Sequence, residues 1–464
     1  MEPAALRQEV LGMFSGAADF VIRKVPLPDG SAAEVFAIDG LVSGTDISES
    51  VVRPLVRGEH IYNSVEDPVE DAGTAAKKLV NGFCIVFFQD RCAAYEVKTG
   101  EKRSPSAPEV ESTVKGAKDA FTETVRTNTS LVRRHLRTPG LRIFETQVGR
   151  RSLTNVSVLS VEGLTNPDYV ARVKARLAQI DIDGLLSPAS VEEYLTGSRA
   201  TAFPLLSYTE RTDKFCQGLL AGRVGLLVDG LPLGYLLPVD LGYLMQSPED
   251  RGTDFVTASC VRVVRYLALL TALLLPGLFV AMAVYQPEML PSQLLGSIIE
   301  SKRGVPFPTV LEVLGLLVAF ELLQEAGIHL PQAIGHTISI IGGLVVGTAA
   351  VEAKLISPAA LIVVSVAGIC GFCLPGQDFS DAVRVWRFLL TLCAAVAGLF
   401  GLTAGAVALL EHLAGLESLG VGYLAPFSRV RGARQLLRPR LNRKTRRDRL
   451  LHPQDEINQS EDRL

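Results

Sequence analysis

The sequence lacks the short motifs that carry most enzyme chemistry. It has no phosphate-binding glycine loop, no zinc-binding pattern and no nucleophile elbow around a serine. Its seven cysteines are an odd number and lie scattered, mostly within apolar stretches, so we expect no disulfide framework. The residues themselves therefore give no sign of catalysis, of a cofactor or of a metal ion.

Two short patterns could suggest otherwise. Cys370 and Cys373 form a "CGFC" motif, which would be a redox pair in a soluble thioredoxin-like setting. Here the motif lies inside an apolar run, so we interpret it as packing. His329 and His336 have no carboxylate or histidine partners that the sequence can place, so we predict no metal site.

Signal-peptide features and long apolar runs are both missing from the first half of the chain. The start "MEPAALRQEVLGMFSGAADF" has no basic segment followed by an apolar core, so we expect the first domain to stay in the cytosol. Residues 261–413, by contrast, contain several apolar runs about as long as a bilayer is thick. The sequence therefore predicts an α/β soluble N-terminal region followed by an all-α polytopic membrane domain.

The soluble half mixes strand and helix patterns. "CIVFFQDRCAAYEV" and "GRVGLLVDGLPLGYLLP" are expected to form strand pairs, the second turning at Asp229 and Gly230. "NPDYVARVKARLAQI" and "GAKDAFTETVRTNTSLVRRHLRT" are each expected to form a helix. The Pro- and Ser-rich "EKRSPSAPEVEST" predicts a boundary between two small mixed subdomains. We place the domains at residues 1–105, 106–254 (with the junction hairpin), 255–427 (membrane helices) and 428–464 (basic tail).

If both termini are cytosolic, the chain must cross the membrane an even number of times. Tyr266 to Tyr285 is a charge-free span preceded by arginines, and residues 286–308 are an interfacial connector. Ile334 to Ala350 and Ala359 to Leu374 are expected to form a helical hairpin, and Phe388 to Leu410 is the last span. Four full spans plus one partly inserted segment satisfy the count, and six crossings remain possible.

The segment from Thr309 to Gly327 contains three carboxylates, Glu312, Glu321 and Glu325. Ionisable groups in lipid are costly and usually face protein or water. The segment is therefore either a buried span with functional glutamates or a half-inserted amphipathic helix, and we favour the second interpretation.

Residues 428–449 hold ten Arg or Lys and one Asp. Such a segment could bind nucleic acid. Because it follows the last apolar run, we favour cytosolic anchoring beside anionic lipid and expect no nucleic-acid partner.

A ladder of small residues marks the helix expected at 334–350. Gly335, Ser339, Gly343 and Gly347 are each four residues apart and share one helical stripe. The stripe favours close helix packing. The alternative is one narrow helix per subunit around a pore, with Val345 or Val346 as an apolar gate. Glu352 and Lys354 would mark the cytosolic end of this helix.

Several collinear blocks resemble the A subunits of spore germinant receptors in endospore-forming bacteria. They run from about Val114 to Phe427 and include "VEGLTNPDYV", "FPLLSYTERTD", "LLAGRVGLLVDG", "RGVPFP", "QEAGIHLP" and "TAAVEAKLISPA". The resemblance implies a membrane protein of the spore inner membrane, without enzymatic activity or cofactor. It also implies a transporter-like B subunit and a lipoprotein C subunit as partners.

The same resemblance implies a homo-oligomeric, nutrient-gated cation channel component in contact with membrane lipid, which raises the pore interpretation above the packing one. It makes Glu210, Arg211 and Asp213 of "YTERTD" candidates for a coupling element between the soluble and membrane domains. The family usually has proline where this chain has Thr212, a longer amide where it has Thr348, and glycine where it has Lys354. A shorter side chain at Thr348 would change the pore lining.

Other functions remain open from the sequence. The stage V sporulation homologue of the same family is one, although "RGVPFP" and "EAGIHLP" fit the receptor branch better. A non-conducting scaffold of the receptor is another. A transporter carrying a small solute would require paired repeats with broken helices, and no internal repeat is visible.

Overall fold

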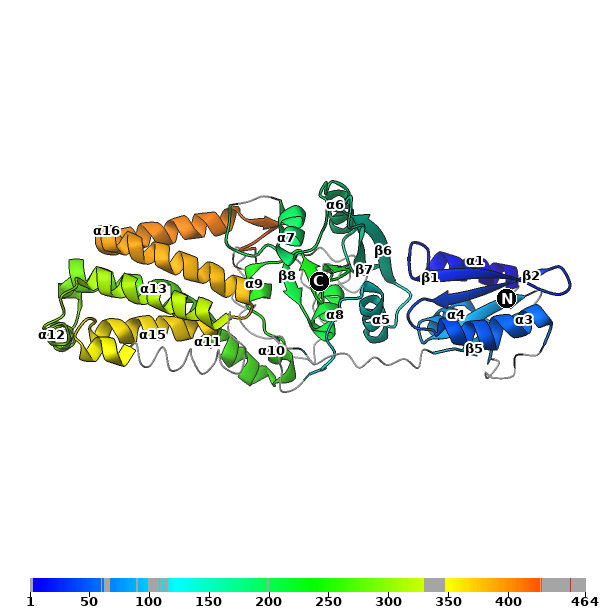
Figure 1. Ribbon diagram of the computed structural model, residues 1–464, viewed down its shortest axis with the longest axis horizontal. Coiled ribbons are helices and arrows are strands. Elements are labelled where there is room, and N and C mark those ends of the chain that lie inside the picture. Colours follow the sequence, from blue (N-terminus) through cyan, green and yellow to red (C-terminus); the bar gives the residue numbers. More distant parts are fainter. Residues whose placement is uncertain are drawn as a thin grey trace, which may run out of the picture.

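The computed structural model describes residues 3–59, 61, 67–88, 91–98, 108, 111, 116–197, 200–328, 347–425, 427 and 451. Three units follow one another along the long axis of the molecule: an N-terminal sheet unit, a second sheet unit and a bundle of helices (Figure 1). The chain therefore has the predicted fold class, an α/β soluble region followed by a helical domain with apolar helices. The expected boundary near residue 105 lies outside the described residues, and the other boundaries remain predictions.

The first sheet has the strand order β1-β2-β4-β5-β3, and every pair is antiparallel. Helices α1 and α4 cover one face, and the helical segment 47–57, which ends in α3, covers the other. Because both faces are buried, β4 reads as an unbroken apolar run in which Ile85 and Val86 pack into opposite cores. The expected pairing of "CIVFFQ" with "RCAAYE" is confirmed. The elements are α1 (Pro3–Met13), β1 (Phe20–Pro26), β2 (Ala32–Ile38), α2 (Gly44–Asp46), α3 (Arg53–Arg57), β3 (Asp67–Pro68), α4 (Ala72–Leu79), β4 (Phe83–Phe88) and β5 (Arg91–Glu96).

The second sheet has the order β6-β7-β9-β10-β8. Helices α6 and α7 pack on one face, and α5 and α8 pack on the other. The expected hairpin is formed by β9 and β10, with Gly230 at a φ of +84° in the turn. The elements are α5 (Val125–His135), β6 (Leu141–Val148), β7 (Thr154–Val161), α6 (Pro167–Ala178), α7 (Pro188–Thr196), β8 (Ser207–Thr209), α8 (Thr212–Leu220), β9 (Val224–Val228) and β10 (Gly234–Leu237).

Helix α5 is shorter than the helix expected from "GAKDAFTETVRTNTSLVRRHLRT". It begins only at Val125, because the preceding residues have other hydrogen-bond partners. Ala120 forms a β-bridge with Arg211, and the Asn128 side chain binds both the N–H and the C=O of Thr122. A local side-chain bond of this kind competes with helix formation.

The two sheet units contact each other through α5 and β6. Arg133 of α5 donates two hydrogen bonds to Asp19 at 2.7 and 2.9 Å, and both side chains are buried. The backbone N–H of Ala18 donates to the C=O of Ile143 at 2.8 Å. The residues just before β1 are thereby fixed to the edge strand of the second sheet.

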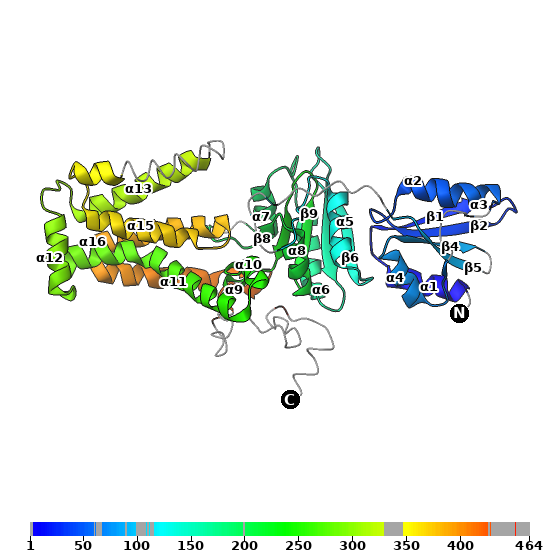
Figure 2. The same ribbon diagram turned by 90° about the horizontal axis from the view of Figure 1, so that it is seen from below.

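The helical domain begins with α9 (Leu241–Leu244) and α10 (Glu249–Gly252), beside the second sheet (Figure 2). The long α11 (Phe255–Val280) continues through a π-helical turn, Ala281–Tyr285, to the far end of the domain. There the short α12 (Ser292–Ser301) lies across the ends of the other helices. Helix α13 (Thr309–Ile328) returns toward the sheets, and residues 347–352, α15 (Pro358–Phe372) and α16 (Gln377–Gly415) are also helical.

Helix α16 differs from the single span expected over Phe388 to Leu410. Its backbone is non-helical at Ala397 and Gly398, where Gly398 has a φ of +60°. The two halves fold back on each other, and the rings of Trp386 and His412 lie 5.5 Å apart. The segment is therefore a helical hairpin with its turn at the far end, and the prediction of one crossing there is wrong.

Within the described residues, the segments Phe255–Tyr285 and Gln377–Gly415 are long and apolar enough to cross a membrane by length and composition, and Pro358–Phe372 is a shorter apolar helix. The chain enters the helices at Phe255 and leaves them at Gly415 on the side of the soluble units (Figures 1 and 2). Strands β11 (Glu417–Ser418) and β12 (Val421–Gly422) follow α16 and lie against the second sheet unit.

Lys354 lies at the far end, against Gly304 of the loop between α12 and α13. The expectation that Glu352 and Lys354 mark the cytosolic end is therefore wrong if the sheets are cytosolic. Lys354 has a φ of +55°, a left-handed conformation that costs a residue other than glycine about 1 kcal/mol. This backbone explains why glycine suits the position.

Candidate functional site

The residues of the expected pore helix are only partly described. Ser339, Gly343, Val345 and Val346 lie outside the described residues. Gly347 is buried, and a Cβ built on it would lie 3.4 Å from Leu361 of α15. Thr348, the next residue, is exposed. The small residue at 347 thus packs against α15, while the polar residue beside it faces away.

Glu312 is buried in the first turn of α13, and its carboxylate binds the backbone just before α15. Its Oε2 accepts a hydrogen bond from the backbone N–H of Ser357 at 2.8 Å, just before α15. Its Oε1 lies 3.7 Å from the ammonium of Lys302. The carboxylate therefore joins α13, α15 and the end of α12.

Glu321 lies nine residues after Glu312 in α13, toward the soluble units. It pairs with Arg384 at 3.1 Å and with Arg387 at 2.9 Å, both in the first half of α16. Gln324 accepts a hydrogen bond from the same Arg384 at 2.7 Å. Glu325 is exposed on the same helix.

These contacts bear on the two interpretations of residues 309–327. Helix α13 packs lengthwise against α15 and α16, with Val313, Leu316 and Leu317 in a shared core. Its carboxylates Glu312 and Glu321 are paired with cations and backbone N–H groups. Paired carboxylates allow the helix to lie within the bundle, which supports the buried-span interpretation, and the depth of the helix in the membrane stays a prediction.

The "YTERTD" motif holds the segment that connects the two sheet units. Arg211 is buried and donates to the carboxylate of Asp213 at 2.8 Å and to the backbone oxygens of Glu111 and Ala117. The Glu210 carboxylate accepts from the N–H of Glu111 at 2.5 Å. The charged part of the motif thus clamps the connecting segment, and its role in coupling remains a prediction.

The tyrosine of the motif reaches the helical domain. The Tyr208 hydroxyl donates to the carboxylate of Asp378 at the start of α16, at 3.2 Å. Burial, the nearby Asp378 charge and the hydrogen bond raise the pKa of Tyr208, so the hydroxyl remains a donor at neutral pH. Burial also raises the pKa of Glu192, which accepts the N–H of Leu205 in the same region.

A buried ion cluster fixes the start of α11 to α10. The Asp250 carboxylate accepts hydrogen bonds from Arg262 at 2.9 Å and from Arg265 at 3.1 Å. Arg265 also donates to the C=O of Met245 at 2.7 Å. Burial works against the ionised form of Asp250, but the bonds and charges of the two arginines outweigh it and lower the pKa.

Sequence reasoning missed this cluster and the pairing of Arg384 and Arg387. In the sequence, all four arginines simply precede apolar runs. Their spacing by three residues, which places each pair on one helical face, is the signal that could have revealed buried pairs.

The exit from the helices is fixed as well. The Ser418 hydroxyl donates to the C=O of Leu205 at 2.6 Å and accepts from the N–H of Val239 at 3.1 Å. The C=O of Leu419 accepts from Arg172 of α6 at 2.7 Å. The chain that leaves α16 is therefore built into the second sheet unit.

The comparison with known protein families decides the identity of this arrangement. The profile of the Bacillus/Clostridium GerA spore germination protein matches residues 8–450. The chain belongs to the GerA spore germination protein family.

Relatives in this family match most of the chain. Spore germination protein KA of Bacillus subtilis (strain 168) is 34% identical over 429 residues, covering 89% of this chain and 79% of that protein. Spore germination protein A1 of the same organism is 36% identical over 361 residues, covering 77% and 75%. The uncharacterized membrane protein YfkQ, also of B. subtilis, is 32% identical over 434 residues, covering 89% and 84%.

A solved structure also matches half of the chain. The N-terminal domain of the A subunit of the Bacillus megaterium spore germinant receptor GerK3 shares 24% sequence identity with the chain. The match covers 50% of this GerA-family chain and 92% of that domain, with a TM-score of 0.39.

Proposed function

We propose that this GerA-family chain is the A subunit of a nutrient germinant receptor and forms, as a homo-oligomer, a nutrient-gated cation channel in the spore inner membrane. It acts with a transporter-like B subunit and a lipoprotein C subunit, is in contact with membrane lipid, and has no enzymatic activity. The observation that carries the proposal is the contrast between two adjacent residues, the buried Gly347 and the exposed Thr348. A helix with one small face for packing and a neighbouring polar face is suited to line an axis between subunits.

The arrangement of the helices supports the topology. The chain enters the bundle at Phe255 and leaves it at Gly415 on one side, which fits soluble units and both termini in the cytosol. The paired carboxylates Glu312 and Glu321 neutralise charge inside the bundle. In this proposal the pore is lined by the helix of the small-residue ladder, with Ser339, Gly343, Val345, Val346, Gly347 and Thr348 as candidates.

The test is potassium flux through the full chain, reconstituted with and without its partner subunits. Val346→Ala and Val346→Ser should raise the leak, because a narrower or more polar side chain weakens an apolar gate. Val364→Ala removes a buried valine of α15 and serves as the control for packing.

The outcomes separate the candidates. A leak in the Val346 variants alone supports a gate, whereas equal loss of folded protein in all three variants supports packing and a scaffold role. Protein that stays impermeable to potassium in every oligomeric state contradicts the channel. A transporter-like gene and a lipoprotein gene beside this one would favour the receptor over the stage V homologue.

A further inference from the structure

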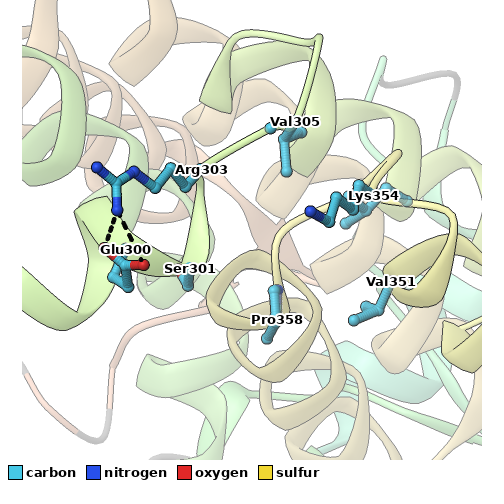
Figure 3. Close-up of a pocket in the computed structure, with 9 residues that line it drawn as sticks. Glu300, Ser301, Arg303, Val305, Val351, Lys354 and Pro358 are labelled. Atoms are coloured by element: carbon cyan, nitrogen blue, oxygen red, sulfur yellow. Dashed lines mark hydrogen bonds and ion pairs between the residues drawn. The ribbon is translucent and has the colours of Figure 1, made fainter.

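An open cavity lies at the end of the helical domain farthest from the sheets. It has a volume of about 490 Å³ and forms where the loop after α12 meets the turn before α15. Figure 3 shows Arg303 and Glu300 on one side of it, and Lys354 and Pro358 on the other. Val305, Val351 and Ile356 supply apolar lining.

The cations around the cavity differ in how they are neutralised. Lys302 is close to the buried Glu312 and donates to Thr309, so its charge is compensated. Among the described residues, the one acid that pairs with Arg303 is the exposed Glu300, at 3.4 Å. Within the described residues, no acid pairs with Lys354, whose side chain lies against Gly304. The lining residues therefore carry one net positive charge.

The surface around the cavity is apolar. Ile299 of α12, Phe307 of the loop, Leu311 of α13 and Leu355 of the turn are all exposed, between 46% and 62%. Exposed side chains of this size at the end of apolar helices are typical of a surface in contact with acyl chains. Long basic side chains at such a place extend toward the headgroup layer.

We infer that this cavity binds the phosphate of a phospholipid in the leaflet opposite the soluble units. Arg303 and Lys354 would bind the phosphate, while Val305 and Ile356 contact the glycerol and upper acyl chain. The inference rests on the membrane placement in the proposed function. It explains why the chain keeps a lysine at position 354, although the backbone there has a φ of +55° and favours glycine.

The experiment titrates the purified full chain, in detergent, with dioctanoyl phosphatidylglycerol. Native mass spectrometry counts the bound lipid, and the unfolding temperature reports stabilisation. The double variant Arg303→Gln/Lys354→Gln should bind about 25-fold more weakly, at about fivefold per cation. Arg303→Lys, which keeps the charge, should stay close to the unmodified chain.

Two further variants sharpen the test. Glu300→Gln should tighten binding, because it releases Arg303 and removes the only acidic lining group. The matched control Arg151→Gln/Lys24→Gln removes two exposed cations of the soluble units, of which Arg151 has a similar weak contact with Asp183 at 3.5 Å. It should leave binding unchanged.

Equal affinity of the Arg303→Gln/Lys354→Gln variant and the unmodified chain would overturn the inference. So would binding of glycerol phosphate, inorganic phosphate or glycine as tight as that of the lipid, which would indicate a site for a soluble ligand. If the chain conducts no potassium but lipid binding follows the expected order, the channel fails and this inference stands. If the chain does not sediment with membranes, both fail.

Discussion

The ion cluster at the base of α11 gives the sharpest test of how the soluble and helical parts are joined. Asp250 is 3% exposed and accepts three hydrogen bonds from two arginines that are themselves buried. Asp250→Asn keeps the shape of the side chain but removes its charge. Two buried guanidinium groups then share one neutral acceptor.

The expected cost follows from the burial of the two cations. Removing one partner of a buried ion pair usually costs 3–5 kcal/mol, and the asparagine oxygen retains part of the bonding, so we expect about 3 kcal/mol. For a domain of roughly 150–250 residues, each kcal/mol lowers the unfolding temperature by about 2–4 °C. The helical domain should therefore unfold about 6–12 °C lower.

The assay is thermal unfolding of the full chain in detergent, followed by tryptophan fluorescence. Trp386 is the only tryptophan of the chain, and its ring lies 6.5 Å from that of Phe203 at the junction of the soluble and helical parts. Glu249→Gln is the matched control, because Glu249 is the exposed neighbour of Asp250 in the same short helix. It should change the unfolding temperature by less than about 2 °C.

The pH dependence gives a second check on the same residue. The lowered pKa of Asp250 means that its contribution is present above the ordinary carboxyl range and is lost as pH falls through about 4 and below. The unfolding temperature of the unmodified chain should fall in this pH range, and that of Asp250→Asn should fall less. If Asp250→Asn and Glu249→Gln both unfolded at the temperature of the unmodified chain, the reasoning would be refuted.

Two other predictions concern the turn of α16 and the connecting segment. Gly398→Ala should destabilise the chain by about 1–3 kcal/mol, because φ is +60° and the new Cβ would lie 2.9 Å from Tyr285. Gly368→Ala, at an open position inside α15, should instead stabilise the chain by up to about 1 kcal/mol, and equal unfolding temperatures of the two variants would contradict the argument. The hydrogen bond that His135 donates to the Asp119 carboxylate raises the pKa of His135, so this stabilisation is present below about pH 6.5 and is lost as pH rises above it. The pKa of Asp119 is lowered to about 2, so this carboxylate stays ionised between about pH 6 and 8. His135→Gln should therefore flatten the fall in unfolding temperature over this pH range. Parallel curves of unfolding temperature against pH for the variant and the unmodified chain would contradict the pairing.

The elements that the sequence predicts well are those defined by local pattern. The strand pairs ending at Glu96 and Leu237 have continuous apolar runs, and the second has an Asp-Gly turn. Helix α6 has one apolar stripe and an Asn166 cap that accepts the N–H of Asp168. These signals act within a few residues, so one sequence contains them.

The elements that escaped prediction depend on distant partners. The turn at Gly398 lies inside an unbroken apolar run, and the groups that fix it, Tyr285 and Gln286, are more than 100 residues away. Glu321 is separated by 66 residues from Arg387, so periodicity alone could not pair them. The pore residues between 339 and 346 stay predictions for another reason, because their packing lies outside the described residues.

The contacts suggest how a signal at one end of the bundle could reach the other. The second sheet unit contacts α10 through Gln217 and Arg251, the start of α16 through Tyr208 and the exit of α16 through Ser418. Asp250 of α10 in turn holds the entry of α11. A shift of this unit must therefore move three helix ends together. The far end connects to the same helices along several elements, because α11 itself runs to that end, α15 packs along α11, and α13 meets the first half of α16 at Glu321. Because packed helices shift as rigid bodies, the pairing of Glu321 with α16 is one of the contacts through which a change at the far end would be transmitted to the soluble units.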